Sequence, residues 1–235
     1  MSAKTPDSSF MVKAVARFAI LMLILPALLF ISAGTVNWPM AWLYSIMTIG
    51  ITAGSRIVMA RANPELVSER AGQHAQEGVQ EWDKKILPIV GFLGPLVMLI
   101  VCGLDKRWGW SLEIPLSGQV AALVVTAAAA LWATWAMLSN KFYSATVRIQ
   151  RDRGHTVVDT GPYRFMRHPS YLGGIVADVA GPLSLGSLWA LVPGVLLSAI
   201  IVHRTAREDK ALLAELDGYN EYARRVRYRL LPGVW

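Results

Sequence analysis

The sequence predicts an all-α, polytopic membrane protein with four transmembrane helices, a C-terminal helical hairpin and a polar cytoplasmic tail. Of its 235 residues, 54% are hydrophobic and only 17% are charged, and the mean hydropathy is +0.41. Soluble domains are usually about 45–50% apolar and about 25% charged. The apolar residues also fall in long blocks separated by short polar stretches, which is typical of membrane-spanning helices.

The first two apolar blocks predict the first two spans. Phe18 to Ala33 is almost uninterrupted apolar sequence, and three basic residues lie before it or at its edge. A cleaved signal peptide would have a shorter apolar core, so we expect a retained helix that Pro26 kinks. Pro39 to Met59 forms the second span, after a turn whose tryptophans suit the membrane interface. In the polar segment that follows, Glu65–Gln80 is expected to form a short surface helix.

Two more blocks predict the third and fourth spans. Ile86 to Leu104 is apolar, but we expect Pro88, Gly91, Gly94 and Pro95 to disturb the helix. A short loop from Asp105 to Pro115 carries two more tryptophans suited to the interface. Ser117 to Leu138 is the fourth span, and its alanine run, Ala127 to Ala130, permits close packing against another helix.

The positions of lysine and arginine predict the orientation. Three of these residues lie in the N-terminal segment, five in residues 56–85, two in 105–116, six in 140–169 and seven in 203–235. Basic residues are in excess on the cytoplasmic side of membrane proteins. Both termini and the segments 56–85 and 140–169 are therefore expected to be cytoplasmic. The short loops and compact size favour a prokaryotic inner membrane.

The apolar run from Ser170 to Val202 must then enter the membrane and return to the same side. The run is short for two full crossings, because each crossing needs about 20 residues. A Gly-Pro pair and Gly186 near its middle can turn the chain. We therefore expect a hairpin with arms Tyr171–Val179 and Leu188–Val202. Asp178 is the one ionisable residue in the run, and it is expected to face a cavity, a partner or water.

Composition disfavours several other classes. The net charge of +7 is explained by basic residues that flank apolar blocks and attract anionic lipid, so nucleic-acid binding is not expected. The single cysteine, Cys102, lies in an apolar block and is interpreted as a small buried hydrophobe. No cysteine or histidine spacing typical of zinc occurs, so no metal site is expected. The sequence also lacks the glycine-rich dinucleotide loop, the P-loop and the nucleophile elbow.

The densest run of reactive side chains is GPYRFMRHPSYLGG, at residues 161–174. Its arginines and tyrosines would suit a loop that anchors at lipid headgroups. A His-Pro pair followed by Gly173 and Gly174 at a helix start favours a ligand site instead. Glycine allows close approach of the backbone, and the free N–H groups of a helix start bind anions. Both interpretations stay open on these residues alone.

A second polar cluster, HRTARED at residues 203–209, follows the hairpin. Arg204 and Glu208 are four residues apart, so they share a helix face and either pair at the surface or bind a ligand together. A guanidinium and a carboxylate at the end of an apolar span suit a zwitterion, with its carboxylate on Arg204 and its ammonium on Glu208. The hairpin would bring this cluster to residues 161–174, so that the two clusters form one pocket.

The tail beyond this cluster alternates aromatic and basic residues. Such a segment anchors at the membrane surface or packs over a bound cofactor. Tyr219 and Tyr222 lie on the same side as Glu208 if the helix continues past Gly218. The two tyrosines are therefore candidate cofactor-binding residues.

Together these elements resemble the isoprenylcysteine carboxyl methyltransferase and phospholipid methyltransferase superfamily. The resemblance covers roughly Asn140 to Trp235 and rests on GPYRFMRHPSYLGG, the preceding NKFYSATVRIQ, an R-x-x-x-E-D element, a Tyr-x-x-Tyr and the closing RLLPGVW. It implies an integral membrane methyltransferase that binds S-adenosylmethionine at the cytoplasmic face, between the last helices and a cofactor-binding tail. It also implies that lipophilic substrates enter from the bilayer.

Methyl transfer from a sulfonium is an in-line displacement, so the protein mainly positions the two reactants. A carboxylate acceptor needs no base, and Arg204 would hold it. A thiol or amine acceptor must lose a proton, which Glu208 or His168 would accept. These three residues are the candidate catalytic residues. The candidate cofactor-binding residues are Tyr163, Arg167, His168, Tyr171, Gly173, Arg204, Glu208, Tyr219 and Tyr222.

The chain is expected to divide into residues 1–139, the N-terminal helices with the cytoplasmic segment 60–85, and residues 140–235, the methyltransferase-like region with the membrane hairpin 170–202. Leu216-Asp217-Gly218 stands where the eukaryotic pattern has Phe-Gly, which disfavours a prenylated protein as substrate. Two other functions remain open. An NADPH-dependent membrane reductase of a lipid double bond, like the sterol reductases, shares part of this architecture. A non-enzymatic membrane scaffold would keep the fold without binding a cofactor.

Overall fold

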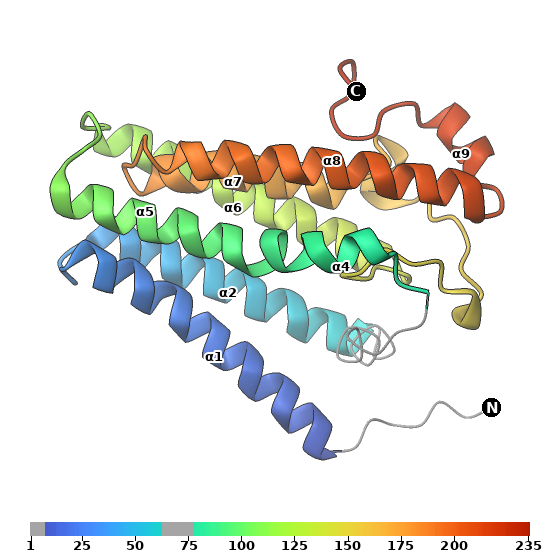
Figure 1. Cartoon of the computed structure of the whole chain (residues 1–235), viewed down its shortest axis with the longest axis horizontal. Helices are drawn as coiled ribbons and strands as arrows, with labels where there is room; N and C mark the ends of the chain where they lie inside the picture. Colours follow the sequence, from blue (N-terminus) through green and yellow to red (C-terminus); the bar gives the residue numbers. More distant parts are fainter. Residues whose placement is uncertain (1–7, 63–77) are drawn as a thin grey trace.

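The computed structural model describes residues 8–62 and 78–235, and within these ranges every regular element is helical (Figure 1). The long helices are α1 (Ser8–Ala33), α2 (Pro39–Ala62), α5 (Gly94–Trp108), α6 (Leu116–Ser139), α7 (Pro169–Ser184) and α8 (Leu191–Glu215). The shorter elements are α4 (Glu81–Pro88), the π-helical η2 (Ile89–Leu93), the 3-10 turns η3 (Arg151–Arg153) and η4 (Gly161–Arg164), and α9 (Tyr219–Arg225). The expected all-α class is confirmed. Most of the expected surface helix Glu65–Gln80 lies outside the described residues.

Three helical stretches are long and apolar enough to cross a membrane: Pro39–Ala62, Glu81–Trp108 and Leu116–Ser139. They correspond to the expected second, third and fourth spans. Within the residues whose side chains the structure describes, the apolar part of α1 is Ala19–Ala33, which is shorter than a full crossing requires. Length and composition therefore support three of the four expected spans.

The third span contains a break in its α-helical geometry. α4 leads into the π-helical residues of η2, and Pro95 follows in the first turn of α5. A proline ring clashes with the carbonyl four residues earlier and has no N–H to donate, so the turn before it widens. The expected disturbance is therefore a local π-helical turn within one continuous helical stretch.

α7 packs closely against α6 through small residues. A Cβ atom added at Gly173 would lie 2.7 Å from the carbonyl oxygen of Ala129 and 3.0 Å from the Cβ of Ala133. Only glycine allows the two backbones to approach this closely. Close packing at the alanine run of the fourth span is thus confirmed.

α7 and α8 form the expected hairpin and contact each other. Its arms are longer than predicted, because α7 runs through Pro182 to Ser184 and the chain turns at Gly186, whose φ is 74°. Asp178 is buried in the hairpin, and within the described ranges its Oδ2 has no hydrogen-bond partner. A Cβ at Gly194 of α8 would lie 2.3 Å from the carbonyl oxygen of Asp178, so the arms are in close contact there.

The prediction of a loop starting at Asp105 was wrong. α5 continues to Trp108 and ends at Gly109, whose φ is 63°. Asp105 stays helical because it is buried and well bonded: it accepts the N–H of Ser111 at 2.8 Å and the hydroxyls of Ser111 and Ser187 at 2.5 Å. This carboxylate joins the end of the third span to the tip of the hairpin.

The polar C-terminal part folds back over the open end of the hairpin. α8 continues to Glu215, and the chain reverses at Gly218, whose φ is 79°, so no single helix runs from Glu208 to Tyr222. Residues 226–235 then return to the turn before α7. There the N–H groups of Arg167 and His168 donate to the carbonyls of Tyr228 and Arg229, both at 2.9 Å. Figure 1 shows α9 beside the end of α8.

Candidate active site

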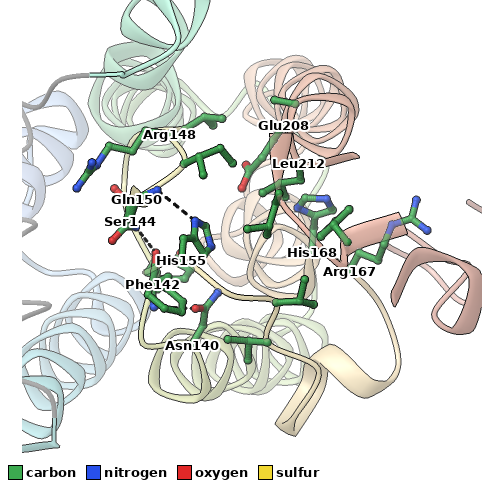
Figure 2. Close-up of a pocket in the computed structure, with 18 of the residues that line it drawn as sticks. Asn140, Phe142, Ser144, Arg148, Gln150, His155, Arg167, His168, Glu208 and Leu212 are labelled. Atoms are coloured by element: carbon green, nitrogen blue, oxygen red, sulfur yellow. Dashed lines mark hydrogen bonds between the residues drawn. The ribbon is translucent and has the colours of Figure 1, made fainter. Parts of the chain in front are cut away.

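A cavity lies where the loop after α6 meets the start of α7 and the polar part of α8 (Figure 2). Its empty volume, including the open mouth, is about 870 Å³. One wall is built from residues 140–158, and the other from residues 168–171 together with residues 208–222. The cavity therefore joins the two polar clusters that the hairpin was expected to bring together.

The loop wall is fixed by hydrogen bonds within the loop. Oδ1 of Asn140 accepts the N–H of Phe142 at 2.8 Å, and the side-chain amide of Gln150 donates to the Phe142 carbonyl at 2.6 Å. Gln150 is buried, and its Oε1 accepts from Arg153 at 2.6 Å. A buried amide that is bonded at both ends specifies one loop conformation.

His155 presents a neutral imidazole on this wall. The backbone N–H of Gln150 donates to its Nδ1 at 3.3 Å, so the ring proton lies on Nε2. Burial, together with the positive charges of Arg148 and Arg153, lowers the pKa of His155 to about 4. Its ring centroid lies 4.6 Å from that of Phe142. This corner of the cavity thus offers an aromatic surface and a neutral N–H donor.

Glu208 and Tyr171 form the facing wall. The hydroxyl of Tyr171 donates to Oε2 of Glu208 at 2.5 Å, and the Tyr171 ring stacks on His168 with centroids 5.8 Å apart. In Figure 2, Glu208 and His168 face the space opposite His155. Among the described residues, no lysine or arginine forms an ion pair with Glu208. Its negative charge is therefore available to a ligand.

Asp209 gathers four donor groups behind this wall. Its carboxylate accepts hydrogen bonds from Nε and Nη2 of Arg167, at 2.8 and 2.9 Å, and from Nε of Arg229 at 2.8 Å. The Tyr219 hydroxyl lies at 2.9 Å and Nε2 of His168 at 3.3 Å. Burial alone would raise the pKa of Asp209, but the hydrogen bonds from His168, Arg167 and Arg229 outweigh it and hold the pKa well below its usual range. In Figure 2 the guanidinium of Arg167 points away from the middle of the cavity, and this guanidinium forms an ion pair with Asp209.

Arg204 does not pair with Glu208 or face the cavity as expected. Its Nε donates to Oδ1 of Asp83 at 2.7 Å, and its Nη2 donates to Oδ2 at 3.1 Å. Nη2 also donates to the carbonyl of Ala145 at 2.6 Å. These contacts bury Arg204 beside α4, and Arg204 is not among the residues that line the cavity. In this structure Asp83 is therefore the partner of Arg204, and the expected role of Arg204 in binding a zwitterion stays a prediction.

The cavity brings most of the candidate residues together. Its lining includes Tyr163, Arg167, His168, Tyr171, Glu208, Tyr219 and Tyr222. Arg204 and Gly173 are not part of the lining, and Gly173 serves helix packing instead. The hydroxyl of Tyr222 donates to the carbonyl of Tyr163 at 2.8 Å, which fixes α9 to the turn before α7. The tyrosines of α9 therefore reach the site through the reversal at Gly218.

Sequence reasoning missed the loop wall and Asp83. Phe142, Gln150 and His155 lie in the polar stretch 140–169, where a histidine next to a turn glycine was the available signal. No local pattern marks Asp83, because its partner Arg204 is 121 residues away. Distant ion pairs of this kind become visible only in the folded chain.

Part of this chain is similar in sequence to part of a sterol reductase. The Delta(14)-sterol reductase TM7SF2 of Mus musculus is 34% identical to this chain over 86 residues, which are 35% of this chain and 20% of the reductase. The match thus spans about a fifth of the length of that protein.

The family comparison covers most of the cavity. Residues 120–214 match the model of the isoprenylcysteine carboxyl methyltransferase (ICMT) family. This stretch contains most of α6, the loop wall, the turn before α7, the hairpin and Glu208. Three helical stretches are also long and apolar enough to span a bilayer. Residues 120–214 are therefore similar to the isoprenylcysteine carboxyl methyltransferase family, and the long apolar helices support an integral membrane protein.

Proposed function

We propose that this protein transfers a methyl group from S-adenosylmethionine to a lipophilic or small acceptor. The observation that carries the proposal is the pairing of the family match with the cavity. Residues within the matched stretch supply the loop wall and Glu208 on the facing wall. One wall carries a carboxylate without a basic partner among the described residues, and the other carries an aromatic corner with a neutral N–H donor.

These groups fit S-adenosylmethionine. Glu208 suits its ammonium group, because a carboxylate forms strong charge-assisted hydrogen bonds with such a donor. The Phe142 and His155 corner suits a purine, which stacks on aromatic rings and accepts an N–H. Arg167 is compensated by Asp209, so it supports the wall and leaves the cofactor contacts to its neighbours.

The chemistry of the reaction comes from the bound cofactor, whose positive sulfur activates the methyl group. The residues of the chain position the reactants, which is the main requirement of an in-line displacement. Nε2 of His168 contacts Oδ1 of Asp209, which orients the imidazole, and a general base here would act through Nδ1. A thiol or amine acceptor would need such a base, and a carboxylate acceptor would not.

The membrane setting favours a lipophilic acceptor that arrives from the bilayer. The cavity lies at the end of the hairpin that adjoins the basic segments 140–169 and 203–235. Basic segments are cytoplasmic in most membrane proteins, which supports a cytoplasmic cavity and cytoplasmic termini here.

Isothermal titration of S-adenosylmethionine into the full-length protein in detergent tests the proposal. Glu208→Gln keeps the side-chain shape and removes the charge, so we expect affinity to fall about tenfold or more, since a bond to a charged group contributes about 1.5–3 kcal/mol. Glu221→Gln removes an exposed carboxylate on α9 and should bind as the wild type does. Failure of the wild type to bind, or equal binding by Glu208→Gln, would contradict the proposal.

An NADPH-dependent reductase acting on a lipid double bond is the second candidate, and the similarity to the sterol reductase favours it. The tail offers exposed arginines for a 2′-phosphate, although Arg225 already pairs with Asp159 at 2.9 Å. Thermal unfolding separates the two functions. Stabilisation by NADPH without stabilisation by S-adenosylmethionine would select the reductase.

A further inference from the structure

We propose that Asp83, in the first turn of α4, is a positioning residue of this site that keeps Glu208 unpaired. Asp83 lies outside the matched residues 120–214 and does not line the cavity. The inference rests on the proposed function, because it concerns the same cavity and the same cofactor.

Asp83 joins two segments that are distant in sequence. Its two carboxylate oxygens accept Nε and Nη2 of Arg204, at 2.7 and 3.1 Å. Oδ2 also accepts the backbone N–H of Val147, a residue of the loop wall, at 2.8 Å. A contact just before α4 reinforces this arrangement, because the N–H of Gln80 donates to the Val147 carbonyl at 3.0 Å. A single carboxylate thus fixes α8 relative to one wall of the cavity.

The ion pair is almost completely removed from water. Asp83 is 0% exposed and Arg204 is 4% exposed. Breaking such a pair leaves a buried charge without a partner, which is strongly unfavourable, so a new ion pair with another nearby group is favoured. The group with which Arg204 would then pair therefore matters for the cavity.

Glu208 is the nearest alternative partner of Arg204 along α8. The two side chains are four residues apart on one helix, a spacing that allows an ion pair. The Arg204 guanidinium already lies over the ring of Tyr171 at 5.3 Å, and Tyr171 donates to Glu208. Without Asp83, Arg204 would turn to Glu208 and neutralise the carboxylate that the cofactor ammonium requires. Asp83 prevents this by holding the guanidinium in two hydrogen bonds to its own carboxylate.

Titration of S-adenosylmethionine into full-length variants tests this role. Asp83→Asn should weaken binding about tenfold or more, the size of effect that follows loss of outer-shell partners of a binding group. Asp83→Asn combined with Arg204→Met removes the competing cation and should recover most of the affinity, which a general loss of stability would not do. Asp83→Glu keeps the charge and should stay closest to the wild type. Glu81→Gln, on the same helix with a side chain that is 85% exposed, is the matched control.

Two outcomes would overturn the proposal for Asp83 while leaving the proposed function intact. One is wild-type affinity in folded Asp83→Asn, and the other is an affinity in the double variant that stays as low as in Asp83→Asn. If Asp83→Asn does not fold, the double variant, which carries no buried charge at this place, is compared directly with the wild type and must bind nearly as well.

Failure of the wild type to bind S-adenosylmethionine would instead contradict the proposed function. The structural part is then tested by amide hydrogen exchange of Val147, whose N–H is bonded to Asp83. We expect fast exchange in Asp83→Asn and slow exchange in the wild type and in Glu81→Gln. Equal exchange in all three would show that Asp83 does not position the loop.

Discussion

The hydroxyl of Tyr171 donates to Oε2 of Glu208 at 2.5 Å, across the open end of the α7–α8 hairpin. The two residues are 37 positions apart, and each lies on a different arm. Their contact exists because the chain enters and leaves the hairpin on the same side. The topology that the basic residues predict is therefore what places these two groups on one wall of the cavity.

Tyr171→Phe should weaken binding of S-adenosylmethionine only modestly. The ring still stacks on His168, and the loss is one hydrogen bond to Glu208, which contributes about 0.5–1.5 kcal/mol, or roughly 2- to 10-fold in affinity. Isothermal titration measures the change, and Tyr228→Phe on the exposed part of the tail is the control. A loss as large as that of Glu208→Gln would mean that Tyr171 itself contacts the ligand.

Gly173→Ala should destabilise the protein by forcing α6 and α7 apart. The new methyl group would lie 2.7 Å from the backbone oxygen of Ala129, which cannot move independently of its helix. Overpacking of this kind costs about 1–3 kcal/mol. Gly174→Ala is the matched control, since its methyl group would be 3.7 Å from the Cδ1 of Ile201. Thermal unfolding in detergent should show a lower Tm for Gly173→Ala alone, and equal values for both variants would contradict the packing role.

Asp209→Asn should lower the stability of the fold at neutral pH and make that stability less dependent on pH in the acid range. The pKa of Asp209 is lower in the folded state than the value of about 3.9 in the unfolded chain. Its stabilisation is therefore complete above about pH 5 and is lost as pH falls below about 4. Removal of one partner from a buried charge cluster costs about 3–5 kcal/mol. Unfolding midpoints from pH 3 to 7 measure this, and parallel profiles for the variant and the wild type would contradict it.

His155→Gln should remove pH dependence in a different range. The pKa of His155 is about 4 in the folded protein and about 6.5 in an unfolded chain, so the unfolded chain binds the extra proton between these values. The contribution of His155 to stability is thus full above about pH 6.5 and falls as the pH drops toward 4. Unfolding midpoints across this range should change less with pH in His155→Gln. His203→Gln, which removes an exposed histidine, controls for the substitution itself.

The features that depend on the bilayer, namely the spans and the hairpin, could be predicted from the sequence. The features that depend on contacts between distant residues could not. Apolar block length predicted the second to fourth spans, and the excess of basic residues on both flanks predicted the hairpin. Helix ends were less predictable, because Asp105 remains helical through bonds to Ser111 and Ser187 that only the tertiary fold creates. Arg204 shows the same limit, since its spacing to Glu208 suggested one partner and the fold supplies another, Asp83.

The backbone bonds from Arg167 and His168 to the carbonyls of Tyr228 and Arg229 have a consequence for biosynthesis. Arg167 Nη1 also donates to the carbonyl of Val226, which is 59 residues further along the chain. Membrane helices insert as they emerge from the ribosome, but the contact between residues 167 and 226 cannot form before residue 226 has been synthesised. The wall behind His168 therefore cannot be completed until residues 226–229 have been synthesised.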